Sequence, residues 1–191
     1  MPDWSDSTLC EHAFEDNTEY FGAVAPPIVQ TTLFTFPSHA AYIQAAACEG
    51  GNYVYTRGLN PTTEIFEKKI AALERGECAK AFSSGMGAIS ATLASLCRAG
   101  DHILLVNNVY GPTTAYCRSL EKFGIETTNI FVEDAAGIEP AIRDNTRILC
   151  YESPSTQMMR LLDIETIVAL AKQRGVLTMT DNTWATPLYQ K

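Results

Sequence analysis

The chain has 191 residues, 46% of them hydrophobic, which is enough to bury the core of an ordinary globular protein. Its formal net charge is −8 and no basic run with interleaved aromatic residues occurs, so we exclude nucleic acid as a partner. The first twenty residues lack the pattern of a secretory leader, and no stretch approaches ~18 uninterrupted apolar residues. We therefore expect a cytoplasmic protein without membrane contact.

The six cysteines lie at least nineteen residues apart, with no C-x-x-C pair and no histidine at ligand spacing. This pattern argues against a zinc site and against a small disulfide scaffold, and it fits a reducing cytosol. We expect no metal site, and we interpret the three histidines, His12, His39 and His102, as structural.

Residues 1–60 are predicted to form an extended N-terminal arm. The segment mixes proline, β-branched and aromatic residues without a sustained period, and only Ser38 to Cys48 has a helical pattern, with Ser38 as its N-cap. An arm of this kind needs another surface to cover.

From Pro61 onward the pattern becomes regular and predicts alternating strands and helices. The first helix starts at Pro61, stops at Gly76 and places Phe66, Ile70 and Leu73 on one face. Short apolar strands alternating with amphipathic helices are typical of βαβ units, so we predict an α/β fold with a parallel sheet. The further predicted elements are strands at 78–82, 102–106, 126–131, 147–151 and 176–180, the last of them buried, and helices at 85–100, 112–124 and 163–175.

The residues that follow these strands suggest one ligand. Ligands of open α/β sheets lie outside the carboxyl ends of the strands, so the residues there belong to one site. A small-residue turn that opens a helix, an aromatic ring and two carboxylates suit a flat, phosphorylated, heteroaromatic molecule. These strand-end segments are 83–86, 110–111, 152–154 and 181–183.

The turn "SSGMGA" leaves backbone N–H groups uncovered at a helix N-terminus, which suits a phosphate, although a tight strand-to-helix turn is the alternative interpretation. NAD is disfavoured because Ser90 stands in place of the third glycine of the dinucleotide motif. Asn107 and Asn108 also occupy the place of the ribose-binding acid.

Asp181 and Tyr110 each have two interpretations. A carboxylate beside a pyridine nitrogen keeps that nitrogen protonated and makes the ring an electron sink, whereas a lone Asp181 would be a solvated acid or a cap. Tyr110 would stack on such a ring or merely pack, and Glu152 would be part of a hydrogen-bond network.

Five segments, "YTRGLNPT", "SSGMGA", "VYGPT", "ESPS" and "DNTWATP", occur in the order and spacing of the Cys/Met-metabolism family of pyridoxal-phosphate (PLP) enzymes. The chain resembles this family, which includes cystathionine β- and γ-lyases, cystathionine γ-synthase and methionine γ-lyase, from about Gly22 to its end. "VYGPT" and "DNTWATP" resemble the cystathionine β-lyase branch most. The resemblance implies the large domain of a fold type I PLP-dependent transferase, with residues 61–191 as its first part.

The resemblance also implies roles for individual residues. Gly85 and Met86 would donate backbone N–H groups to the cofactor phosphate, with Ser84 nearby. Tyr110 would stack on the pyridine ring. The residues implied in the cofactor site within 61–191 are Ser84, Gly85, Met86, Tyr110, Asp181, which would hold the ring nitrogen, and Thr183, close to the ring.

The arm is implied to complete the site of a neighbouring subunit. Tyr55 and Arg57 would reach the phosphate there, and Tyr55 or Tyr110 would assist protonation in catalysis. The implied assembly is a homo-oligomer, a tetramer made of two active pairs.

The sequence departs from the family pattern in two ways. Thr156, followed by Gln157, stands after "ESPS" where the family often has the asparagine that sits by the cofactor's 3-oxygen. The Ser-x-Thr-Lys motif of the cofactor-binding lysine and the substrate-binding arginine of a C-terminal domain are not found, and Lys191 does not match. The sequence thus resembles an N-terminal half, and we expect residues 1–191 alone to be inactive.

We therefore expect a PLP-dependent C–S lyase of transsulfuration and methionine metabolism, acting by β-elimination on cystathionine or a similar thioether amino acid. The alternatives are γ-synthase or γ-lyase chemistry on homoserine-derived amino acids, and a non-catalytic cofactor-binding or assembly module.

Overall fold

The computed structural model describes residues 4–47 and 51–191, and the chain divides into two compact units. The first unit extends to Ala81 and includes Lys191, and the second comprises Phe82–Gln190. Among the described residues, no helix has both the length and the apolar character needed to cross a membrane.

The second unit is built on a four-stranded sheet in the order β2-β1-β3-β4, with every pair parallel. The parallel α/β fold predicted from the sequence is therefore confirmed. The four predicted strands after residue 100 are present, and their bounds are β1 His102–Val106, β2 Glu126–Ile130, β3 Thr146–Glu152 and β4 Leu177–Asp181.

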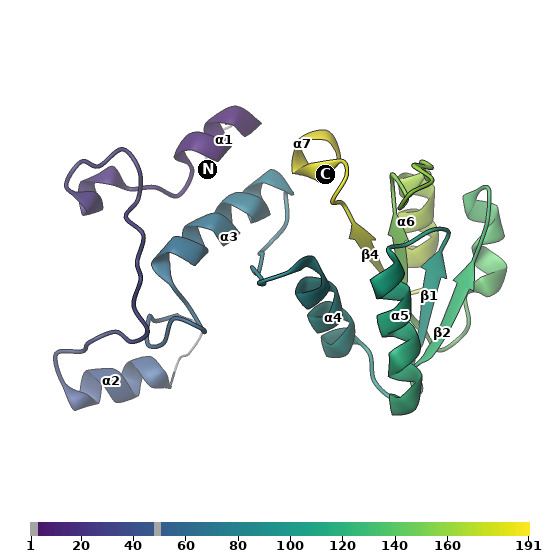
Figure 1. Ribbon diagram of the computed structural model, residues 1–191, viewed down its shortest axis with the longest axis horizontal. Helices are drawn as coiled ribbons and strands as arrows, with labels where there is room; N and C mark the ends of the chain where they lie inside the picture. Colours follow the sequence, from purple (N-terminus) through teal and green to yellow (C-terminus); the bar gives the residue numbers. More distant parts are fainter. Residues whose placement is uncertain (1–3, 48–50) are drawn as a thin grey trace. The chain divides into compact units, whose positions relative to one another are not determined.

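Helices cover both faces of this sheet (Figure 1). Ile103 and Leu105 of β1 pack against α4 and α5, whereas Leu104 and Val106 lie in the core on the other side, together with α6. Residues 103–106 of β1 and 148–151 of β3 are buried on both faces of the sheet, and these stretches are continuously apolar instead of alternating. The bounds are α4 Gly85–Leu96, α5 Gly111–Ser119, α6 Ile164–Gln173, α7 Thr186–Tyr189, η2 Leu120–Phe123, η3 Ala135–Gly137 and η4 Glu139–Ala141.

The ends of α6 lie where the sequence predicts them. The Asp163 side chain accepts a hydrogen bond from the Thr166 amide at 3.1 Å, and Gly175, with φ +68°, follows the last turn. Hydrogen bonds from the Thr166 hydroxyl and amide lower the pKa of Asp163, because they stabilise its charged form. The cap and the left-handed glycine fix where the chain enters and leaves this helix.

Two predictions about strands are wrong. Residues 78–82 form no strand, because they have no partner in the sheet and the Ala81 amide donates to Glu67 Oε1 at 2.9 Å instead. The last strand exists as β4 but is not buried: Leu177 is 38% exposed. The reason is that β4 is an edge strand, paired only with β3 among the described residues.

The first unit contains more helix than predicted. Besides α2 (His39–Ala46), which Ser38 caps as expected, it contains α1 (Asp6–His12) and the short η1 (Asn17–Tyr20). Ser5 caps α1, and Leu9 packs with Ala13 and Leu73 in a small core, which stabilises a helix that the sequence pattern did not indicate. The end of the predicted 38–48 helix, Cys48, lies outside the described residues.

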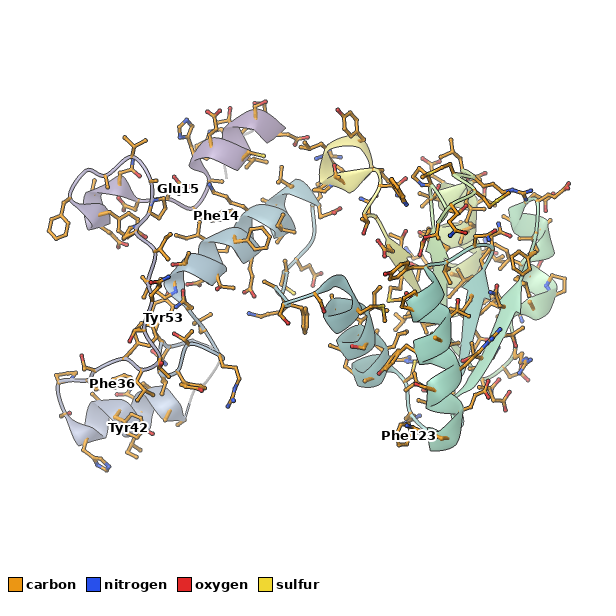
Figure 2. All side chains as sticks on the ribbon, in the orientation of Figure 1. Phe14, Glu15, Phe36, Tyr42, Tyr53 and Phe123 are labelled. Atoms are coloured by element: carbon orange, nitrogen blue, oxygen red, sulfur yellow. The ribbon has the colours of Figure 1, made fainter. Side chains whose placement is uncertain are left out.

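The predicted helix from Pro61 is α3 (Pro61–Leu73), and it belongs to the first unit. Leu73 is buried against α1, but Phe66 is 54% exposed, so the expected apolar face is covered only in part. Lys69, on the same helix, forms an ion pair with Glu15, which is labelled in Figure 2.

Aromatic pairs organise the rest of the arm. Phe36 and Tyr42 lie with ring centroids 5.6 Å apart (Figure 2). The ring centroids of Phe34 and Tyr53 are 5.5 Å apart. The Tyr53 hydroxyl donates to Glu64 on α3, and burial together with this hydrogen bond raises the pKa of Tyr53 to about 12. Phe21, Val24, Ile28 and Leu33 remain exposed along the arm. That residues 1–60 cover a neighbouring subunit stays a prediction.

Candidate functional site

A pocket of about 660 Å³ opens at the carboxyl ends of the strands in the second unit. The sheet order places it where the chain changes direction: α5 leads from β1 to one side of the sheet, and α6 leads from β3 to the other side and the opposite face. The loops after β1 and β3 therefore diverge and leave a crevice, which is the usual ligand site of such sheets. The pocket is lined by Gly85, Met86, Ile89, Tyr110, Gly111, Pro112, Glu152, Thr156, Gln157, Met159, Asp181, Thr183 and Trp184.

One wall is the N-terminus of α4. The Ser84 hydroxyl accepts the Gly87 amide at 3.0 Å, but the amides of Gly85 and Met86 donate to no other described residue. Apart from its chain neighbours and the adjoining helix backbone, no described atom lies within 4 Å of the position that a Cβ on Gly85 would take, so this backbone is open to a ligand. A Cβ on Gly87, in contrast, would lie 3.1 Å from the Ser84 hydroxyl. The turn thus presents two unused donors beside the positive end of a helix.

Tyr110 follows β1 and begins α5. Its ring lines the pocket and is 46% exposed. The preceding turn is fixed by Asn107, which adopts φ +60° and accepts the Val132 amide on its side-chain oxygen at 2.8 Å. An exposed aromatic ring on a fixed turn is suited to stack on a flat ligand.

Asp181 is the last residue of β4, and Thr183 binds one of its oxygens. The Thr183 amide, at 3.0 Å, and hydroxyl both donate to Oδ1, whereas no described residue donates to Oδ2. The half-buried carboxylate is therefore oriented through one oxygen and has the other available for a ligand N–H. This is the arrangement that the proposed partner of a pyridine nitrogen requires.

Glu152 ends β3 and is 4% exposed. Its Oε1 accepts the Tyr110 amide at 2.5 Å, and its Oε2 accepts the Thr156 amide at 3.0 Å and hydroxyl at 2.6 Å. The hydrogen-bond network suggested for Glu152 by the sequence is present. Three donors occupy both oxygens, in contrast with Asp181.

The structure brings most of the sequence-predicted site residues of the second unit into this one pocket. Gly85, Met86, Tyr110, Asp181 and Thr183 line it, with Ser84 behind them as the cap of α4. Sequence reasoning missed the apolar wall, because buried and pocket-lining apolar residues have the same pattern; Pro112 and Trp184 lay within quoted motifs but were given no role. The missed lining residues with large apolar side chains are Ile89, Pro112, Met159 and Trp184.

Tyr55 and Arg57 belong to the first unit and are not among the lining residues of this pocket. The Arg57 guanidinium lies 4.9 Å from the centroid of the Tyr55 ring, and Tyr55 forms an antiparallel bridge with Leu33.

The pocket lining contains no lysine. Lys68, Lys69 and Lys80 pair with carboxylates of the first unit, and Lys191 pairs with Asp6.

The residues of the pocket fit PLP. The open amides of Gly85 and Met86 suit its phosphate, the Tyr110 ring its flat ring and the free oxygen of Asp181 its ring nitrogen. The volume lies within the ~300–1,000 Å³ common for small-ligand sites. Within residues 4–47 and 51–191, no group of three His, Cys, Asp or Glu side chains is placed to hold a metal ion.

We expect inorganic phosphate to bind at the Gly85 and Met86 amides, because these donors have no partner among the described residues. Crystals grown or soaked in phosphate test this directly, with the anion oxygens ~2.7–3.2 Å from both nitrogens as the expected result. A Gly85→Ala variant, whose Cβ enters the open space, is the matched control and is expected to lose the ion. Phosphate bound elsewhere, with this turn empty, would contradict the assignment.

Comparison with known proteins identifies a family of PLP-dependent enzymes. Residues 7–191 match the model of the family described as Cys/Met metabolism PLP-dependent enzyme. An L-methionine gamma-lyase of Fusobacterium nucleatum subsp. polymorphum is 43% identical over 90% of this chain and 44% of its own length. A cystathionine gamma-lyase of Bacillus subtilis is 36% identical over 96% of this chain and 46% of its own length.

A solved structure is also similar. The putative O-acetylhomoserine (thiol)-lyase of Campylobacter jejuni has a TM-score of 0.88 at 30% identity, over 97% of this chain and 46% of that one, and it contains N'-pyridoxyl-lysine-5'-monophosphate. The chain spans less than half the length of each of these three proteins. The matched family model covers nearly all of the sequence, and so the chain belongs to the Cys/Met metabolism family of PLP-dependent enzymes.

Proposed function

We propose that this chain provides the cofactor-binding pocket of a PLP-dependent lyase that cleaves carbon–sulfur bonds in thioether amino acids. The observation that carries the proposal is the pocket itself, in which an open helix N-terminus, an exposed tyrosine ring and a carboxylate with one free oxygen surround a single space. The whole protein would act on a small amino acid, without nucleic acid or membrane.

Each of these groups has a separate task. The Gly85 and Met86 amides bind the phosphate, and Tyr110 holds the flat ring from one face. Asp181 Oδ2 keeps a proton on the ring nitrogen, while Thr183 holds Oδ1 and prevents the carboxylate from rotating. When bound there, the cofactor would supply an electron sink, which lowers the barrier to removal of the substrate Cα proton.

The departing sulfur needs a proton as its bond to carbon breaks. The Tyr110 hydroxyl, or that of Tyr55 from a neighbouring subunit, would supply it. The apolar wall formed by Ile89, Met159 and Trp184 suits the hydrocarbon part of a thioether substrate.

Two reactions are compatible with this machinery. The motifs "VYGPT" and "DNTWATP" favour β-elimination of cystathionine. The name of another relative, a putative cystathionine beta-lyase of Rhizobium johnstonii that is 36% identical over 96% of this chain, favours the same reaction. The names of two relatives, L-methionine gamma-lyase and cystathionine gamma-lyase, favour γ-elimination instead. We regard γ-elimination as the second candidate.

The products distinguish the two reactions. With PLP and the protein expressed from its complete reading frame, β-elimination of cystathionine gives homocysteine, pyruvate and ammonia, whereas γ-elimination of methionine gives methanethiol, 2-oxobutanoate and ammonia. Thiol release with either keto acid supports the lyase. A protein that binds PLP but releases no thiol from either substrate supports the non-catalytic binding module.

Asp181→Asn is expected to retain PLP but to lower kcat by ~10³-fold, because an amide does not stabilise the protonated ring nitrogen. Turnover and bound cofactor are measured on the same preparation. Asp144→Asn, the same change at an exposed position, is the control and should leave both quantities unchanged. Turnover of Asp181→Asn within a factor of two of the unmodified protein would remove Asp181 from this role.

We further propose that the protein is a homo-oligomer, a tetramer made of two active pairs, in which the arm of residues 1–60 covers a neighbouring subunit. The exposed apolar side chains of the arm and the Arg57 guanidinium, a donor suited to phosphate, support this proposal. Each site would then take Tyr55 and Arg57 from one subunit and Asp181 from the other.

Mixing inactive Arg57→Ala subunits with inactive Asp181→Asn subunits tests this arrangement. If the site is shared, a mixed dimer contains one site with both defects and one intact site, so activity should return. Arg57→Ala subunits mixed with a second batch of themselves are the control. Mixed dimers that are verified by mass but stay inactive would contradict the shared site.

A further inference from the structure

Glu152 is the most enclosed charged group of the pocket. It is 4% exposed, and both of its oxygens accept hydrogen bonds from loops that leave the sheet in opposite directions. Tyr110 belongs to the loop after β1, which leads to α5, and Thr156 to the loop after β3, which leads to α6. One carboxylate therefore joins the two sides of the crevice.

Three hydrogen-bond donors surround the buried Glu152 carboxylate. Hydrogen bonds to a carboxylate are stronger than those to a neutral group. The three that Glu152 accepts replace the hydrogen bonds to water that it loses on burial. Glu152 Oε1 accepts the amide of Tyr110, the N-cap residue of α5, so the carboxylate also lies at the positive end of this helix. Both Glu152 oxygens already accept hydrogen bonds, whereas no described residue donates to Asp181 Oδ2.

The same interaction restrains both walls. The Tyr110 amide is held directly, which fixes the Cα from which its ring projects. On the other side, the Thr156 hydroxyl donates a hydrogen bond to Glu152, and the loop continues through Gln157 and Met159, which adopt φ +61° and +50°. Side chains in left-handed backbone are tolerated only where neighbouring contacts hold them.

We propose that Glu152 is a positioning residue that holds the Tyr110 ring and the Thr156 loop at the separation a flat cofactor needs. The inference rests on the proposed function, since it assumes that PLP stacks on Tyr110. It assigns Glu152 no contact with the reacting atoms and no proton transfer. Its effect on PLP passes through the Tyr110 backbone.

Glu152→Gln tests this, because glutamine offers one acceptor and one donor group. Whichever way the amide is oriented, its NH₂ faces either the Tyr110 amide or the Thr156 amide, so one loop loses its acceptor. In the protein from the complete reading frame, we expect the PLP dissociation constant to rise about tenfold. The visible circular dichroism of bound PLP, which reports ring orientation, should fall as well.

A double-variant cycle separates positioning from general stability. If Glu152 acts through the ring, then Glu152→Gln should change the PLP dissociation constant by less than about twofold in a Tyr110→Ala background. Glu133→Gln, the same change at an exposed position outside the pocket, is the matched control and should have no effect in either background. An equal weakening with and without the Tyr110 ring would overturn the proposal.

Thr156→Val supplies a second test if Glu152→Gln does not fold. It removes the hydroxyl donor and keeps the backbone amide, so we expect about a threefold rise in the PLP dissociation constant and a smaller dichroism. An unchanged PLP dissociation constant together with an unchanged dichroism spectrum would overturn the proposal.

The failure of this proposal can be distinguished from the failure of the proposed function. If the unmodified protein binds no PLP, the proposed function itself fails. If it binds PLP but these variants do not alter binding, only the role of Glu152 fails.

Discussion

The pairing of β1 with β3 is the contact on which the rest of the second unit depends. The chain makes β2 on one side of β1 and returns to place β3 on the other, so two strands that are far apart in sequence lie in register, with Leu105 opposite Cys150. This pairing opens the crevice and sets Tyr110 beside Glu152. Both strands are apolar on both faces, and the hydrophobic effect stabilises the pairing on each side.

The pairing of β3 with β4 positions the second carboxylate of the pocket, Asp181. In the parallel pairing of β3 with β4, Glu152 lies opposite Asp181, and neighbouring strands are ~4.8 Å apart. Two acidic residues thus occupy equivalent positions on adjacent strands and have different surroundings. Three donors surround Glu152, whereas Asp181 is bound through one oxygen only. The local hydrogen bonds, and not the residue type, separate a framework role from a ligand-binding role.

Much of this arrangement was predictable from local sequence. The apolar runs at 102–106 and 147–151, the Asp163 cap and the residues after each strand are encoded within a few positions, and parallel strand ends must meet at one edge. Long-range contacts were not predictable in this way. Residues 78–82 have a strand pattern but no partner, α1 depends on Leu9 meeting Leu73, and the exposure of β4 depends on what pairs with its outer edge. The link from Glu152 to Tyr110 joins residues 42 positions apart, which periodicity does not report.

Two glycines at the start of α4, Gly85 and Gly87, are subject to different constraints, one from a ligand and one from the fold. Gly87 serves the protein itself, because a side chain there would crowd the Ser84 hydroxyl that caps the helix. Gly85 does not, because open space surrounds the position of its missing Cβ. A descendant of this sequence that no longer needed an anion would be free to change Gly85 while keeping Gly87. Divergence at the first glycine alone would then mark the loss of cofactor dependence in a protein whose architecture had not changed.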